Sequence, residues 1–575
     1  MEALESRELL ASIAPLPDTE RLTRNDVQRI LAAAASQALP TQVIVVVDRD
    51  GQVLGSLAMK NANLGPINDE KGKPNALLLN VVKALTRART GAFFESHEDA
   101  FTTRTARFII QDHFPQPLPN TGGGPLYGVQ FSSLPGSDVY SGPAISGDPG
   151  GIPLFKNGQP VGGIGVAGDG NDVRARFDLP YDPNVSGVNE IFNGKEEHDV
   201  DEQVALAGAR KFMAPDRVQA TDIFVGGLRF PFTADQPASG NADQTLDQIT
   251  SSGAASLIIG DKVGGTALIG APYSAQGSVK PRGSPGSPYP AATIAGVNGE
   301  FKNTSSRANN FGLIGSDDSN ASGVLPDADR LTKNDVRRII TQAVNQASPT
   351  RAALRLPIGV PMRVHIIVVD RTGDILGAFR MEDGTNFSFD VAAQKARTAA
   401  FFSDNKHAFT ARAVGFLSQK FFPTGIDGGL EGPLFHLQNE LSLGGNDLGV
   451  ANRGANVPGG TAPNIIRNGI TIFPGGAPLY KNGQLVGGIG VSGDGVDQDD
   501  ITTFAGTKHF QPDKHIRSDF LSETKIVNFM TSKLVFIRDN YNVGSKVIQD
   551  SIDKLALGLD DVQLPYIKFP RNPEL

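Results

Sequence analysis

The chain contains no cysteine among its 575 residues. This absence excludes disulfides, thiolate nucleophiles, cysteine-based zinc sites, iron–sulfur clusters and haem attached through thioethers. A protein without thiols is also compatible with an oxidising compartment. From the chain as written we expect a cytoplasmic protein. If a leader preceding MEALESRELL has been removed, we expect an exported one, periplasmic or extracellular.

Other absences narrow the class of partner. The net charge is −8 and no block of Lys and Arg stands out, so a nucleic-acid partner is not expected. No apolar run approaches the roughly 18 residues that span a bilayer, so no membrane span is expected. The chain also lacks a P-loop, a dinucleotide fingerprint, a Ser-His-Asp arrangement and a His-rich metal motif, which weakens assignment as a hydrolase or kinase. A small molecule or another protein is the expected partner.

The sequence repeats itself. The stretch PLFKNGQPVGGIGVAGDG at 153–170 returns as PLYKNGQLVGGIGVSGDG at 478–495. Further pairs recur in the same order: LTRNDVQRIL at 22–31 with LTKNDVRRII at 331–340, VIVVVDRDGQVLG at 43–55 with HIIVVDRTGDILG at 365–377, ARTGAFF at 88–94 with ARTAAFF at 396–402, and GPLYGVQ at 124–130 with GPLFHLQ at 432–438. Shared order over most of both halves indicates a duplication.

Each copy predicts the same elements. Thr23 and Asp26 form a helix-start signature, β-branched residues from Ile44 to Val47 predict a central strand, and Asn157-Gly158 predicts a tight hairpin turn. The resulting order, α-β-β-α-β-β-α, indicates an α+β unit in which helices pack on an antiparallel sheet. We expect a first unit at 1–231, a Gly/Ser/Pro-rich linker or interface arm at 232–325, and a second unit at 326–575. Fusion would make the pairing of two units intramolecular, and we expect the chain to associate further into a homo-oligomer.

The stretches VVDRTGDILGAFRMEDG, QKARTAAFF and GGAPLYKNGQLVGGIGVSGDGVDQDD resemble the GlcG/HbpS-like haem-binding family, often labelled haem-degrading. The resemblance covers most of both halves, and it implies two tandem profilin-like units. It also implies haem as the cofactor, with haem storage, sensing or breakdown as the role. Its motifs are more specific for the fold than for chemistry.

The resemblance places the ligand site in the second unit. The residues that carry it over are Arg380, Met381, Lys395, Gly488, Gly490, Ser492, Gly493 and Asp499. The first unit departs from the pattern, because Ala58 stands for Arg380, Arg87 for Lys395 and Ala167 for Ser492. We therefore expect the first unit to support structure or pairing.

Each of these residues also has a structural interpretation. Arg380 and Lys395 would hold haem propionates or another organic anion, or form ion pairs with a neighbouring acid such as Asp370. The glycines would admit a flat ligand, or pack against a helix. The acids from Asp494 to Asp500 argue against an anion at that helix start and suggest capping instead, while their spacing lacks a complete calcium loop.

Haem iron in this chain needs His, Tyr or Met as a ligand. The first candidates are His407 and His436, and His365 is a further candidate. None of the three has a histidine counterpart in the first unit. Two alternatives to haem binding stay open. One is an enzyme acting on a small organic acid or aromatic compound, with Arg380 and Lys395 binding the anion, and the other is a non-catalytic assembly module.

Overall fold

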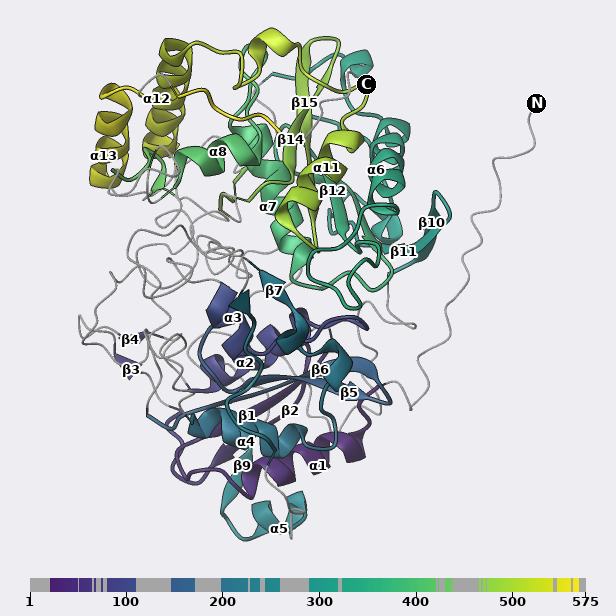
Figure 1. Ribbon diagram of the computed structural model, residues 1–575, viewed down its shortest axis with the longest axis vertical. Coiled ribbons are helices and arrows are strands. Elements are labelled where there is room, and N and C mark those ends of the chain that lie inside the picture. Colours follow the sequence, from purple (N-terminus) through teal and green to yellow (C-terminus); the bar gives the residue numbers. More distant parts are fainter. Residues whose placement is uncertain are drawn as a thin grey trace.

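The computed structural model describes residues 21–567 apart from several gaps. The gaps are 50, 65–66, 69–73, 76–79, 110–145, 171–197, 226–227, 238–243, 259–288, 319–322, 420–421, 423–429, 436, 438–464, 467–468, 472, 541–544 and 560–561. Figure 1 shows two lobes stacked along the long axis of the molecule. The described residues of 21–258 form the N-terminal lobe, and those of 289–567 form the C-terminal lobe.

The N-terminal lobe is built on a five-stranded antiparallel sheet with the strand order β5-β6-β1-β2-β9. Its strands are β1 (Val43–Asp48), β2 (Val53–Met59), β5 (Gly151–Lys156), β6 (Gln159–Ala167) and β9 (Ala255–Leu257). Helices α1 (Arg24–Ala35), α4 (Val200–Ala209) and α5 (Leu246–Ser251) lie on one side, and α2 (Asn80–Phe93) and α3 (Thr103–Ile109) on the other. Two small hairpins are β3 (Ile67–Asn68) with β4 (Pro74–Asn75), and β7 (Phe224–Val225) with β8 (Leu228–Arg229).

The C-terminal lobe has a six-stranded antiparallel sheet with the order β10-β11-β13-β12-β15-β14. Its strands are β10 (Ala291–Ile294), β11 (Val297–Phe301), β12 (His365–Asp370), β13 (Ile375–Met381), β14 (Gly476–Lys481) and β15 (Gln484–Ser492). Helices α6 (Lys333–Ala347) and α11 (Val496–Gly506) cover one face, and α7 (Ser388–Phe401) and α8 (Ala411–Leu417) the other. Helices α12 (Glu523–Asn540) and α13 (Ser545–Ala556) pack outside α7 and α8 (Figure 1).

The two sheets share their pairing register. Val43 lies opposite Ala167 and Asp48 opposite Gly162, just as His365 lies opposite Ser492 and Asp370 opposite Gly487. Both β1–β2 and β12–β13 shift register at the same point along the strand. The α+β architecture predicted from the sequence is therefore confirmed, with one short helix, α3 or α8, inserted within the predicted order of each lobe and further elements added outside it.

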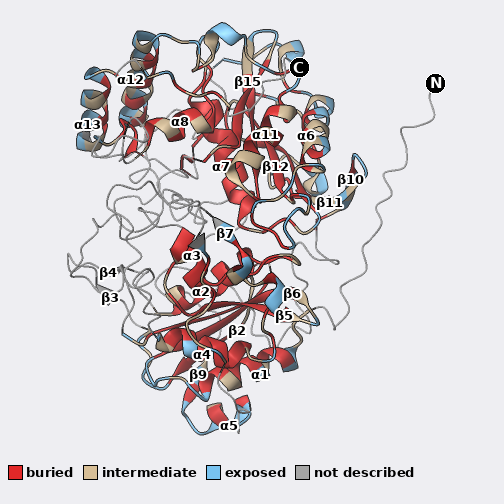
Figure 2. Ribbon diagram, viewed as in Figure 1, coloured by how far each residue is buried: buried red, intermediate tan, exposed pale blue. Residues whose placement is uncertain are grey.

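Local sequence explains these elements. Thr23 and Asp26 form a capping box at the start of α1, and Thr332 and Asp335 repeat it in α6. Every residue of β1 is buried (Figure 2). Alternate side chains of the strand enter the hydrophobic clusters on the two faces of the sheet. Asn157-Gly158 has two positive φ angles, 53° and 77°, as a two-residue hairpin of the predicted type requires.

The segment 232–325 does more than connect the lobes. Its described residues include α5 and β9, which complete the N-terminal sheet at β2, and β10–β11, which extend the C-terminal sheet at β13. The interpretation as a linker or arm therefore needs correction, because strands within the segment belong to the two sheets. A strand edge left open exposes unpaired backbone groups, and these additions cover it.

The lobes meet through a buried contact. The Asp383 carboxylate, which follows β13, accepts from Arg49 Nη2 at 2.8 Å and from the backbone amide of His97 at 3.0 Å. The rings of Phe94 and Phe387 stack beside it with centroids 4.3 Å apart. This contact joins the end of β1 in one lobe to the opposite end of the equivalent sheet in the other.

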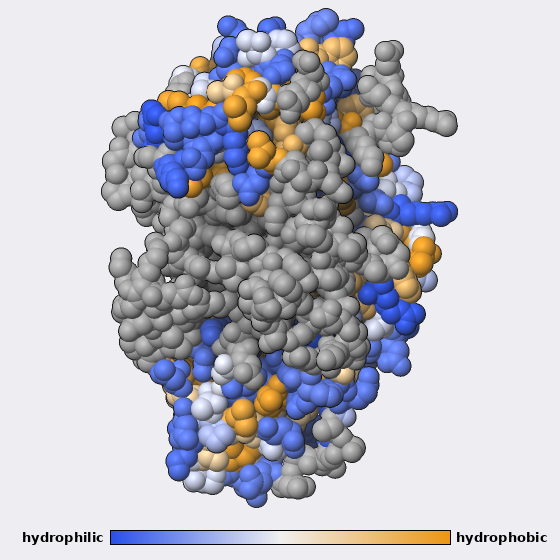
Figure 3. All heavy atoms as spheres, turned by 60° about the vertical axis from the view of Figure 1, so that its left-hand side comes forward, coloured by the Kyte–Doolittle hydropathy of each residue, from blue (hydrophilic) through white to orange (hydrophobic). Residues whose placement is uncertain are grey.

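Hydrophobic and hydrophilic residues are interspersed over the described surface of both lobes in the view of Figure 3. Among the described residues, no helix combines the length and apolarity needed to cross a membrane.

Candidate functional site

Lys395 and Asp499 form a buried ion pair. Lys395 Nζ donates to Asp499 Oδ2 at 2.7 Å and to the Val491 carbonyl at 2.8 Å. Burial raises the pKa of the Asp499 carboxyl to about 7, against the lowering effect of the Lys395 ammonium. The N-terminal lobe holds the same arrangement, since Arg87 Nη1 donates to Asp201 Oδ2 at 2.7 Å and to the Val166 carbonyl at 2.6 Å. A pair repeated in this way ties helix to sheet in both lobes.

Arg380 is also engaged within the protein. Its Nε donates to the Gly384 carbonyl at 2.7 Å, and its Nη1 donates to Glu300 of β11 at 3.1 Å. The neighbouring Met381 is fully buried in the core under α6. The acids that pair with Arg380 and Lys395 are therefore Glu300 and Asp499, whereas Asp370 bonds Thr372 in its own turn.

The glycines of β15 face a helix. A Cβ on Gly490 would lie 1.9 Å from the Ala392 carbonyl oxygen of α7, and one on Gly488 would lie 2.3 Å from the Ala396 carbonyl oxygen. The close approach is thus between strand and helix backbones, the packing alternative considered above. Ser492 is buried at the end of the same strand. A Cβ on Gly493 would lie 2.6 Å from the Arg363 carbonyl oxygen, which also leaves no space beside it.

Asp494 does not cap α11. The N-cap is Gly495 and makes no side-chain cap bond, so the capping interpretation is wrong for this residue. Asp494 Oδ2 instead accepts from Arg355 Nε at 2.5 Å and from the Arg363 amide at 2.6 Å. Arg355 Nη1 also donates to Asp383 at 2.9 Å, so the helix-start acid joins the charge cluster between the lobes.

The candidate iron ligands are not brought together. His365 is fully buried, and neither ring nitrogen has a hydrogen-bond partner among the described residues. Burial, reinforced by the Lys302 and Arg380 charges, holds the pKa of His365 well below its usual range, so the imidazole is neutral. His407 is partly buried, its Nδ1 lies 3.0 Å from Asp404 Oδ1, and its ring stacks on Phe529. His436 lies outside the described residues.

A pocket of about 570 Å³ lies at the other end of β12 from His365. Six residues at about 3.3 Å each separate the two ends by roughly 20 Å. Its lining comes from the turn after β12, the end of α7, the loop that follows it, and α12. The lining residues are Arg371, Thr372, Ala400, Phe401, Ser403, Asp404, Asn405, Lys406, Ile465, Leu485, Lys533 and Phe536. None of the residues predicted as ligands is among them.

The pocket combines cations with aromatic walls. Arg371, Lys406 and Lys533 line it together with one acid, Asp404. Lys533 Nζ lies 4.9 Å from the ring centroid of Phe401, and no carboxylate among the described residues pairs with it. Desolvation lowers the pKa of Lys533 to about 8, and Asp404 opposes that shift. A cation desolvated beside aromatic rings is typical of a site for an organic anion. Sequence reasoning missed it, because Lys533 comes from a helix outside the repeated unit.

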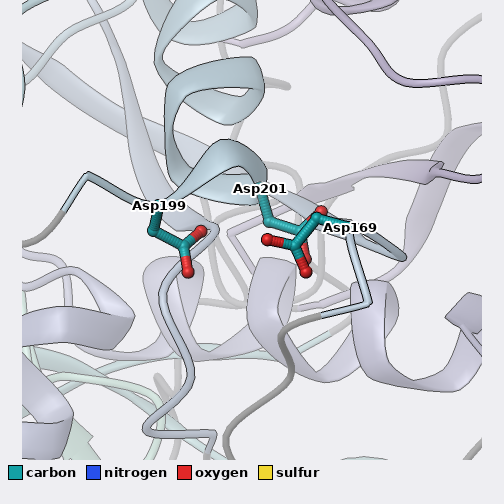
Figure 4. Close-up of side chains that lie close together, drawn as sticks. All are labelled: Asp169, Asp199 and Asp201. Atoms are coloured by element: carbon teal, nitrogen blue, oxygen red, sulfur yellow. The ribbon is translucent and has the colours of Figure 1, made fainter. Parts of the chain in front are cut away.

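A cluster of three acids stands at the start of α4 (Figure 4). The nearest carboxylate oxygens of Asp169, Asp199 and Asp201 all lie within 4.8 Å of one another. Two of the three already have protein partners, since Asp199 caps α4 through the Glu202 amide and Asp201 pairs with Arg87. The cluster is explained by these structural bonds.

One segment of the chain matches a known protein family. Residues 331–508 match the family described as haem degrading protein HbpS-like. No curated protein matches the chain. Two solved structures are similar. A PduOC–haem complex is 22% identical, covering 32% of this chain and 95% of its own, with a TM-score of 0.21. The Klebsiella pneumoniae protein ORFY, of the DUF336 family, is 20% identical, covering 33% and 97%, also with a TM-score of 0.21. With TM-scores this low, neither structure supports a conclusion about this chain.

Proposed function

We propose that the C-terminal lobe binds haem in the pocket between α7 and α12. The observation that carries the proposal is the lining of this pocket, which combines two lysines, two phenylalanines and one acid with Arg371, itself paired with Asp318. The walls belong largely to the segment that matches the HbpS-like family. Storage, sensing or breakdown of haem are the roles this family suggests.

The residues present fit the organic part of haem. Its propionates would lie by Lys533 and Lys406, because both ammonium groups line the pocket and a carboxylate pairs strongly with a cation. Its porphyrin face would lie against Phe401 and Phe536. Bound haem would supply oxygen and redox chemistry, whereas the protein would supply orientation and charge.

The iron ligand we propose is His407. None of the pocket-lining residues is a His, Tyr or Met, but His407 bonds Asp404, which lines the pocket. Its Nδ1 faces that carboxylate, so Nε2 is the nitrogen left to bind iron, as is usual for metal-binding histidines. His365 has two unbonded nitrogens, yet it is sealed in the sheet under α7.

The test is a hemin titration followed by Soret absorbance. We expect saturation near one haem per chain, and His407→Ala should shift the Soret band or weaken binding. His515→Ala is the matched control, because His515 lies in the same lobe away from the pocket lining. Absence of a saturable Soret change would reject haem binding. Loss in Arg380→Met with full retention in Lys533→Met would move the site to the other end of the sheet.

We also propose that the lobes arose by duplication of one GlcG/HbpS-like unit. The shared register and the repeated pairs Arg87–Asp201 and Lys395–Asp499 support this. The buried contact between the lobes supports the alternative function, a non-catalytic assembly module. That alternative includes formation of a homo-oligomer. Light scattering on the purified chain distinguishes a monomer from a homo-oligomer.

A further inference from the structure

The contact between the lobes shows which chemical group binds at the end of the N-terminal sheet where β1 finishes. The end of the N-terminal lobe that carries Arg49 binds the Asp383 carboxylate through three groups, one of which is His97 Nδ1, 2.6 Å from Oδ1. Arg49 Nη2 donates to Oδ1 at 2.8 Å, and the His97 amide donates to both oxygens at 3.0–3.1 Å. Phe93 and Phe94 provide the apolar floor, and the Phe93 carbonyl accepts from the Phe387 amide at 3.3 Å. The end is thus a receptor for a carboxylate next to an aromatic ring.

The pocket occupies the equivalent end of the C-terminal lobe. Arg371 follows β12 as Arg49 follows β1, and Phe401 ends α7 as Phe93 ends α2. The loops after these helices close in the same way, since the Ser96 amide donates to the Asp99 carbonyl at 2.9 Å and the Asp404 amide donates to the His407 carbonyl at 2.8 Å. His97 therefore corresponds to Asn405, and Glu98 corresponds to Lys406, a pocket-lining cation.

The pocket end of the C-terminal lobe contacts α12, whereas the equivalent end of the N-terminal lobe contacts the other lobe. Phe529 of α12 stacks on His407, and Phe536 lies 6.1 Å from Phe401 between ring centroids. Among the described residues, none from α12 or α13 places a carboxylate where Asp383 lies in the other contact, and α12 presents Lys533 instead. Arg371 pairs with Asp318 through Nη2 at 2.8 Å, while its buried Nε has no acceptor among the described residues. Asp318 thus occupies one edge of Arg371, while Lys406 and Lys533 line the pocket with Asp404 as its one acid.

We propose that this pocket is a carboxylate site, filled by a flat aromatic acid whose carboxylate takes the place that Asp383 takes between the lobes. Lys533 and Lys406 are the binding cations, and Phe401 is the wall. The proposal deepens the proposed function, on which it rests for the choice of pocket, but it does not require iron. Two sources share this chemistry, namely the propionates of a porphyrin and a small arene carboxylate.

The test measures binding of three probes to the full chain by calorimetry and fluorescence. The probes are metal-free protoporphyrin IX, its dimethyl ester, and 2-naphthoate. We expect the first to bind and the ester to bind at least ten-fold more weakly, because esterification removes the charge. Binding of 2-naphthoate as well would assign the site to small arene acids, and its failure beside protoporphyrin binding would assign it to porphyrins.

Variants locate the site. Lys533→Met should weaken binding of the acid probes at least ten-fold, and Lys533→Arg should restore it to within about three-fold. Lys525→Met is the matched control, since Lys525 is exposed on the same helix. Lys533→Met should leave the melting temperature unchanged or raised, because it removes a desolvated charge. If it fails to fold, Lys406→Met at an exposed pocket position replaces it.

Three outcomes with the acid probes would overturn the proposal. They are no binding of either acid, equal binding of acid and ester, or acid binding that Lys533→Met and Lys406→Met leave unchanged. Hemin binding that persists in both variants would also reject this carboxylate site while leaving haem binding by the chain intact. Loss of hemin binding with retained binding of protoporphyrin IX in His407→Ala would instead support both the site and the iron ligand.

Discussion

Replacing Lys395 by Met tests whether this lysine holds a ligand or the fold. Its side chain is 1% exposed and that of its partner Asp499 is 4% exposed, so the substitution leaves a carboxyl group buried without its cation. Removing one partner of a buried pair costs about 3–5 kcal/mol. For a lobe of this size, 1 kcal/mol corresponds to roughly 2–4 °C, so we expect the lobe to melt about 6–20 °C lower.

The pH dependence makes the prediction sharper. The pKa of Asp499 is already raised to about 7, above its unfolded value, so its stabilising contribution is complete at acid pH and is lost as pH rises through 7. Without the ammonium that pKa rises further, because the attraction that favoured the charged form is gone. The loss of stability should therefore be larger at pH 8 than at pH 5.

Calorimetric melting of three variants is the assay. Arg87→Met is the matched variant, since it removes the same bond from the N-terminal lobe. The double variant Lys395→Met/Asp499→Asn should recover much of the loss, because a neutral amide costs less to bury. An unchanged melting temperature combined with lost hemin binding would refute the structural interpretation and return Lys395 to the ligand site.

Three further predictions concern packing and the contact between the lobes. Gly490→Ala should cost about 1–3 kcal/mol in urea unfolding, since its Cβ would meet the Ala392 carbonyl oxygen at 1.9 Å; an unchanged free energy of unfolding would contradict the packing described. Burial raises the pKa of Asp99 to about 7, so Asp99→Asn should raise the melting temperature at pH 8 and leave it unchanged at pH 4; equal effects at both would contradict this. Arg355→Met leaves the buried carboxylates of Asp383 and Asp494 without their cation, so it should weaken the contact between the lobes. We expect faster proteolysis between the lobes and a larger radius of gyration in X-ray scattering. Wild-type behaviour in both measurements would argue against the charge cluster as what holds the lobes together.

The fold could be predicted from the sequence where the pattern is local. The Thr23 capping box, the buried run from Val43 and the Asn157-Gly158 turn each depend on neighbouring residues, and each forms as predicted. Strand β9 and the β10–β11 hairpin could not be predicted, because they are short and join the sheets by pairing with β2 and β13, which come from elsewhere in the chain.

The candidate site was harder to predict for the same reason. Lys395 matches the family motif whether its role is to bind a ligand or to pair with Asp499. Only the distance between Lys395 Nζ and the Asp499 carboxylate distinguishes the two roles. Lys533 carries no local signal, since an isolated lysine on an amphipathic helix is usually solvated. Its importance depends on Phe401, more than a hundred residues away in the chain. The repeat could have marked Arg371, because its counterpart Arg49 serves the other lobe.

The contact through Asp383 has a consequence for assembly. It joins opposite ends of two similar lobes, so it is a head-to-tail contact, and such contacts add subunits without limit unless something closes the last end. In this chain α12 and α13 lie over that end, as terminal caps do in repeat proteins. The C-terminal helices therefore occupy the position at which a further lobe would dock in the same way.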